Sequence, residues 1–136
     1  MSAPARDWAR FGQLYLDDGV APGGARILPE GWVAMSRTST LGSLYGAGFW
    51  TTAGDGEDAQ SLVARGMPKG AFFASGNLGQ RIYIVPSERL VLVRLGVSFG
   101  ERNGLDADLD FMNAVIAHSH DPAVAAGPPL TPNTAE

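Results

Sequence analysis

Large apolar residues recur at helical spacing in three parts of the chain. Residues 4–18 predict a helix, because their large apolar side chains fall on one face and Gly19 can end it. Residues 29–37 predict a shorter helix that starts at a proline. Between Leu105 and Ile116 the apolar residues lie at positions i, i+4, i+7 and i+11, the pattern of an amphipathic helix.

Three other segments have the composition of β-strands. Residues 45–52 are rich in aromatic residues and threonine, and their two glycines imply a bulge or the close approach of another backbone. Residues 80–85 and 90–95 are apolar runs separated by four turn-forming residues, which predicts a hairpin. Both runs hardly alternate with polar residues, so we expect two central strands with both faces covered. The predicted fold class is α+β, an antiparallel sheet with N- and C-terminal helices packed on it.

Two segments offer little to a core. Residues 53–60 are acidic and glycine-rich and predict a solvated loop. Residues 119–136 are rich in proline, alanine and threonine and predict a disordered tail, which leaves one folded unit over residues 1–118.

Composition excludes several classes of function. A net charge of −4 and a pI near 5.0 argue against nucleic-acid binding, since no basic stripe is present. The absence of cysteine removes disulfides, thiolate metal sites and cysteine nucleophiles. No apolar run has the length of a signal peptide core or a membrane span, so we expect a soluble chain without either.

Acidic and histidine residues near the C-terminus could suggest a metal site. His118 and His120 fall at the end of the predicted helix, where solvated side chains are the better interpretation. Asp106 and Asp108 resemble the opening of a calcium loop, but its glycine and its final acidic residue are missing, so helix capping is the better interpretation. We expect no metal and no cofactor.

Three stretches of the sequence together resemble class C β-lactamase-like, or penicillin-binding-protein-like, serine hydrolases. They are residues 5–16 with 26–33, residues 45–50, and residues 74–80 followed by the predicted hairpin. The resemblance covers roughly residues 2–118. It implies the C-terminal portion of a partial β-lactamase-like fold, and acyl transfer from a small ester, amide or β-lactam.

Acyl transfer in this family depends on three catalytic elements, and we looked for each of them in the sequence. The first is Ser-x-x-Lys, and it is absent because the sole lysine, Lys69, follows a glycine three places earlier. The second is Tyr-x-Asn or a similar triplet, and no tyrosine here has asparagine two places later. The third, Lys/His-x-Gly on a strand, maps by resemblance onto Asn77-Leu78-Gly79, where glycine leaves room for substrate. Gly76 and Gln80 beside it are further substrate-binding candidates.

Asparagine at position 77 can donate a hydrogen bond but supplies neither a proton nor a positive charge. Two functions therefore remain open. One is a C-terminal fragment of a serine hydrolase that is inactive alone and that could self-associate through exposed sheet edges. The other is a binding or interaction module derived from the same fold, without catalysis.

Overall fold

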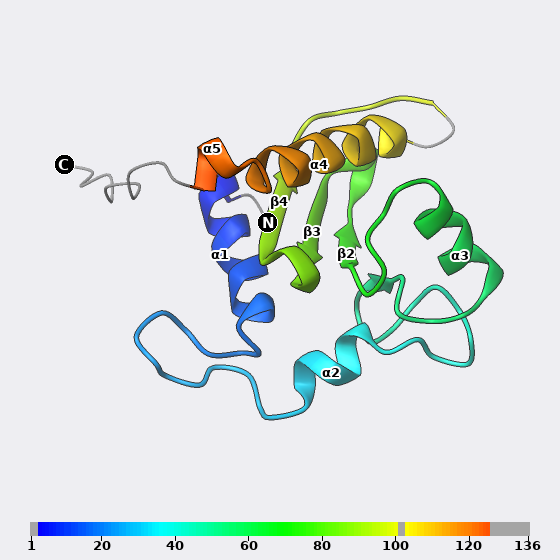
Figure 1. Cartoon of the computed structure of the whole chain (residues 1–136). Coiled ribbons are helices and arrows are strands. Elements are labelled where there is room, and N and C mark those ends of the chain that lie inside the picture. The colour runs from blue at the N-terminus through cyan, green and yellow to red at the C-terminus, as the bar shows by residue number, and fades with distance from the viewer. Residues whose placement is uncertain (1–2, 101–102, 126–136) are drawn as a thin grey trace.

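The computed structural model describes residues 3–100 and 103–125, which form a four-stranded antiparallel sheet with helices on both faces (Figure 1). The predicted α+β class is confirmed. The strands follow one another in the order β1-β2-β3-β4. The elements are α1 (Ala5–Leu16), α2 (Trp32–Arg37), β1 (Trp50–Thr51), α3 (Glu57–Ala64), β2 (Phe72–Ser75), β3 (Arg81–Val85), β4 (Leu90–Arg94), α4 (Leu105–Ser119) and α5 (Pro122–Ala125).

Each face of the sheet carries its own apolar core, because successive residues of a strand point to opposite faces. Phe72 and Ile82 face α1 and α2, in a cluster with Phe49 and Val33. Phe73 and Tyr83, their neighbours in sequence, face α3 and α4. That second cluster contains Leu62, Met67, Ala71, Phe73, Tyr83, Val85, Leu92, Leu109 and Met112. All five residues of β3 are buried, so this strand is central as predicted.

Helix α1 lies unusually close to the sheet at Gly12, its one buried residue. A Cβ atom placed on Gly12 would come within 2.5 Å of Val91 on β4 and 3.2 Å of Ile82 on β3. The helix ends at Leu16, two residues before its predicted end, and beyond it the Gly19 N–H donates to the Leu14 carbonyl at 2.7 Å, with Gly19 at a φ of 81°. Glycine therefore serves both the packing and the end of this helix.

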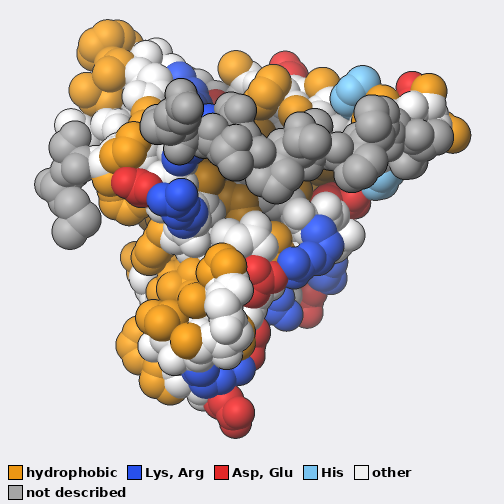
Figure 2. All heavy atoms as spheres, turned by 90° about the vertical axis from the view of Figure 1, so that its left-hand side faces the viewer, with side chains coloured by type: hydrophobic (Ala, Val, Ile, Leu, Met, Phe, Trp, Pro, Cys, Tyr) orange, Lys and Arg blue, Asp and Glu red, His pale blue; other side chains and the backbone are white. Residues whose placement is uncertain are grey.

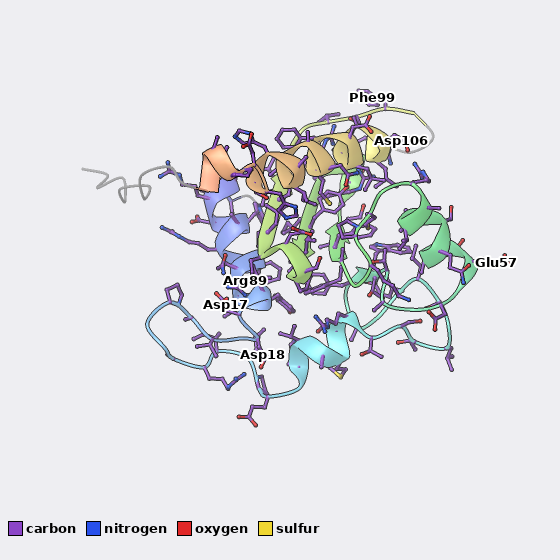
Figure 3. All side chains as sticks on the ribbon, in the orientation of Figure 1. Asp17, Asp18, Glu57, Arg89, Phe99 and Asp106 are labelled. Carbon is purple, nitrogen blue, oxygen red and sulfur yellow. The ribbon has the colours of Figure 1, made fainter. Side chains whose placement is uncertain are left out.

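The end of α1 is also tied to the β3–β4 turn. Arg89, at a left-handed φ of 49°, donates to the Asp17 carboxylate at 2.7 Å, and the two side chains lie close together in Figure 3. Hydrogen bonds from Gln13 and Arg89 hold the pKa of Asp17 below its ordinary value. The predicted hairpin over residues 80–95 is confirmed, with a 3-10 turn at Pro86–Glu88.

Four sequence predictions need correction. Strand β4 lies at an edge of the sheet, so it is not central. Residues 45–52 form only a two-residue strand, because Gly46 packs against the Ser36 carbonyl and the chain then turns back. Residues 57–60 of the predicted loop begin α3, since Ala59 and Leu62 bury one face of a helix. Helix α2 starts at Trp32, three residues after the proline.

The predicted tail differs as well. Its first residue, Ser119, is the last of α4, and Pro122–Ala125 form the helical turn α5. Residues 126–136 of the predicted tail lie outside the described residues. The stripe from Leu105 to Ile116 is confirmed, with Leu109 and Met112 fully buried in α4.

Exposed large apolar side chains occur on helices and on several loops, and Leu41, between α2 and β1, is fully exposed. Seen from the α1 side, hydrophobic side chains gather over the segment between α1 and α2, where Ile27 is 59% exposed (Figure 2). Phe99, on the loop between β4 and α4, is 84% exposed and points away from the molecule (Figure 3).

Candidate functional site

The residues that match the family's third element form a turn and not a strand. Asn77–Gly79 is a 3-10 turn that joins β2 to β3, with Leu78 at a φ of 58° and Gly79 at a φ of 83°. A Cβ atom on Gly79 would collide with the Asn103 carbonyl oxygen. The backbone conformation and this contact therefore each require glycine at position 79.

A cavity of about 520 Å³ opens beside this turn. It lies between α1 and the end of the β2–β3 hairpin. Its wall combines apolar side chains with amide and hydroxyl groups. The lining residues are Ala3, Trp8, Ala74, Ser75, Gly76, Asn77, Gln80, Arg81, Ile82 and Leu95. Three of the five candidate residues, Gly76, Asn77 and Gln80, therefore share one pocket, whereas Leu78 and Gly79 do not line it.

The backbone of β2 beside the pocket extends past the end of its pairing with β1. The Gly76 N–H donates to the Gln80 carbonyl at 2.7 Å, so Gly76 and Ala74 direct their backbone groups toward β3. Ser75, between them, directs its N–H and carbonyl the other way. The pairing of β1 with β2 extends only over Phe72 and Phe73, so Ser75 lies beyond its end. An extended ligand could bond to Ser75 in the manner of an added strand.

The described lining of the pocket contains no nucleophile–base pair. Ser75 is its only hydroxyl residue, and no histidine or carboxylate is among the lining residues. Arg81 is its only charged residue, and its side chain is 7% exposed. Acyl transfer here would need a base and an activated hydroxyl from outside the lining residues.

A buried ionic network lies beneath the pocket, on the α4 face of the sheet. Asp108 accepts hydrogen bonds from Arg81 on β3 at 2.9 Å and from the Tyr83 hydroxyl at 2.8 Å, and its other oxygen lies 2.9 Å from Nε of Arg94 on β4. Asp108 is 5% exposed. Burial, and then the hydrogen bond to Asp108, raise the pKa of Tyr83.

Sequence reasoning missed this network. Asp106 and Asp108 lie in the first turn of α4, as expected, but neither caps the helix through a side-chain hydrogen bond. Asp106 pairs instead with Arg65 of the α3 end. A signal was present, since Asp108 lies three places after Leu105 and next to Leu109, on the apolar face of the helix. A carboxylate on a buried face requires a cationic partner.

The remaining candidates are surface contacts. His120 lies 2.7 Å from Glu88 of the β3–β4 turn, and Lys69 lies 3.4 Å from Asp55. Within residues 3–100 and 103–125, no group of three or more histidine, aspartate or glutamate side chains could hold a metal ion. None of the helices in that part of the chain is long and apolar enough to cross a membrane.

No protein-family model matches the chain. Over 96 residues, or 70% of its length, it is 32% identical to the 6-aminohexanoate-dimer hydrolase of Paenarthrobacter ureafaciens. This chain is similar to a hydrolase. The matched residues span 24% of that hydrolase, so the chain covers about a quarter of the length of this relative. The likeness and the α+β fold agree with a part of a larger hydrolase.

Proposed function

We propose that this chain is the C-terminal part of a β-lactamase-related serine hydrolase, of the class C or penicillin-binding-protein-like type. We propose further that the pocket at the end of β2 forms one wall of its acyl-transfer site. The observation that carries this proposal is the 32% identity over 96 residues to a hydrolase about four times as long as the match. The resemblance of residues 5–16 with 26–33, 45–50 and 74–80 to that family supports the same interpretation.

The pocket suits a linear amide with an aliphatic chain. Trp8, Ile82 and Leu95 offer apolar surface for methylene groups, while Asn77 and Gln80 offer amide donors and acceptors. The outward backbone N–H of Ser75 can donate to a substrate carbonyl oxygen, which is the role of a backbone donor at a developing oxyanion. The 6-aminohexanoate dimer, a linear amide, is therefore the first substrate to test.

The reacting groups must come from another segment. The sequence contains neither Ser-x-x-Lys nor Tyr-x-Asn, so the proposal assigns both to the part of the hydrolase that corresponds to the remaining three quarters of the relative. We expect no hydrolysis by this chain alone.

A chimera tests the proposal. The segment of the Paenarthrobacter ureafaciens hydrolase that matches this chain is replaced by the chain, and hydrolysis of 6-aminohexanoate dimer is measured. We expect activity from the chimera and none from the chain by itself. The control is the same chimera with the relative's nucleophile changed to alanine, which should be inactive. A folded chimera without activity would count against the proposal, and so would labelling of the chain alone by a fluorophosphonate serine probe.

A second candidate is a non-catalytic binding module. It is favoured by Asn77, which stands where the family has a charged or titrating residue, and by a pocket whose lining holds no base. This candidate predicts that the chain alone binds a small amide tightly and that the chimera stays inactive. Calorimetric titration with 6-aminohexanoate dimer separates it from the hydrolase fragment, which should bind only weakly without the rest of its site.

A further inference from the structure

The turn beside the pocket is held in place from the opposite face of the sheet. Arg94 reaches across from the end of β4, and its Nη1 donates to the Gly79 carbonyl at 2.7 Å and to the Gly96 carbonyl at 2.9 Å. Its Nη2 contacts the Ser98 hydroxyl. Gly79 precedes the pocket residue Gln80, and Gly96 follows the pocket residue Leu95. One guanidinium therefore connects two segments of the pocket wall.

Asp108 in turn fixes that guanidinium. Its Oδ1 lies 2.9 Å from Arg94 Nε, and its Oδ2 accepts from Arg81 Nη1 at 2.9 Å. The same Arg81 nitrogen donates to the Asn103 carbonyl at 3.0 Å. That carbonyl is the group that packs against Gly79, where even one added carbon atom would collide with it. The turn is thus contacted by the Arg94 guanidinium and by the Asn103 carbonyl that Arg81 holds. Both arginines bind the carboxylate of Asp108.

We propose that Asp108 is a positioning residue for the pocket, which sets the place of the turn Asn77–Gly79 and of Leu95 through Arg94 and Arg81. The assignment of a ligand to this pocket rests on the proposed function, but the coupling itself does not. A planar guanidinium with several fixed bonds transmits position well, because its donors cannot move independently. A buried carboxylate between two arginines is stiff for the same reason, since every displacement loses a charge-assisted bond.

The test compares three variants of the whole chain. Asp108→Asn removes the charge that holds both arginines. Arg94→Lys keeps a positive charge beside Asp108 but cannot reach Gly79, Gly96 and Ser98 together. If Asp108→Asn fails to fold, Arg94→Lys alone tests whether the turn depends on this network. Asp110→Asn is the matched control, an exposed aspartate on the same helix.

Amide hydrogen exchange gives the readout. The Gly76 N–H bonds to the Gln80 carbonyl and the Ser98 N–H bonds to the Leu78 carbonyl, so both report on the turn. The Thr52 N–H, bonded to the Ala71 carbonyl at the far end of β2, reports on the sheet away from it. We expect exchange at Gly76 and Ser98 to become roughly tenfold faster or more in Asp108→Asn and Arg94→Lys, with little change at Thr52 and none in Asp110→Asn.

If Asp108 only stabilised the fold as a whole, the variants would accelerate hydrogen exchange equally at the Gly76, Ser98 and Thr52 amides. That result, or unchanged exchange at Gly76 and Ser98, would overturn the inference. Titration of each variant with 6-aminohexanoate dimer adds the functional readout, and we expect a weaker Kd in Arg94→Lys than in Asp110→Asn. If the unaltered chain binds no dimer, the ligand assignment fails, while the exchange rates still decide whether Asp108 positions the turn.

Discussion

The Tyr83 hydroxyl on β3 donates a hydrogen bond of 2.8 Å to the Asp108 carboxylate on α4, and both side chains are buried. This bond joins the central strand to the C-terminal helix. It also gives Asp108 a third partner besides Arg81 and Arg94. A buried carboxylate needs such partners, because an unsatisfied charge in the interior costs several kcal/mol.

Removing the hydroxyl should weaken the fold measurably. We expect Tyr83→Phe to lower the free energy of unfolding by about 2 kcal/mol, the usual size for a hydrogen bond to a charged group. Urea unfolding followed by circular dichroism measures it. The control is Tyr45→Phe, which removes the same hydroxyl from a ring that is 42% exposed and should change stability little. Equal stability of the two variants would show that the bond contributes nothing.

The same tyrosine predicts a loss of stability in alkali. Its pKa is raised above the ordinary value of 10.0, so the folded chain keeps a proton that the unfolded chain releases. The contribution is fully present below pH 10 and is lost as the pH rises from there toward the folded pKa. We expect the urea midpoint to fall more steeply above pH 10 in the unaltered chain than in Tyr83→Phe. Parallel profiles would contradict this.

Gly12 should be intolerant of a methyl group although it lies in a helix. Gly→Ala in an exposed helix stabilises by about 1 kcal/mol. At Gly12 the new Cβ would lie 2.5 Å from Val91, and overpacking of this kind costs about 1–3 kcal/mol. We therefore expect Gly12→Ala to lower the melting temperature. The double variant with Val91→Ala should recover part of the loss, and a double variant that shows simple additivity would refute the contact.

Alanine variants of two glycines with nearly the same φ can separate the cost of backbone strain from the cost of a steric clash. Gly79 has a φ of 83° and Gly70 a φ of 82°, but of the two only Gly79 has neighbouring atoms within reach of an added Cβ atom. Left-handed strain costs each alanine variant about 1–2 kcal/mol. Contact with the Asn103 carbonyl should add about 1–3 kcal/mol at Gly79 alone. Chemical denaturation of Gly79→Ala and Gly70→Ala measures the difference, and similar losses would argue against the tight packing of this turn.

The outer edge of β4 predicts self-association. Within the described residues this strand pairs only with β3, and by the alternation of the ladder Val91 and Val93 direct their N–H groups outward. We expect the sedimenting mass of the chain to rise with concentration. Val93→Pro, which removes an outward donor, should reduce this rise, whereas Val93→Ala, which loses a similar side chain but keeps the donor, should not.

Much of the fold could be predicted because it depends on local periodicity. The stripe from Leu105 to Ile116 specifies α4, and the turn-forming residues 86–89 between two apolar runs specify the hairpin. The short strand at Trp50 and the whole of helix α3 could not be predicted, since long-range contacts end the strand and bury one face of the helix. Of the predicted site residues, Gly76, Asn77 and Gln80 line one pocket, and their role in binding a substrate stays a prediction.

By itself, the sequence determined that the chain contains no Ser-x-x-Lys motif, because that is a property of residue order. It also determined α1, α4 and the hairpin, whose apolar spacing is local. Only the tertiary structure decided that Asn77–Gly79 is a turn, that β4 is an edge and that Asp108 holds Arg81 and Arg94 together. Those outcomes depend on residues far apart in the chain that meet only when the two faces of the sheet are covered.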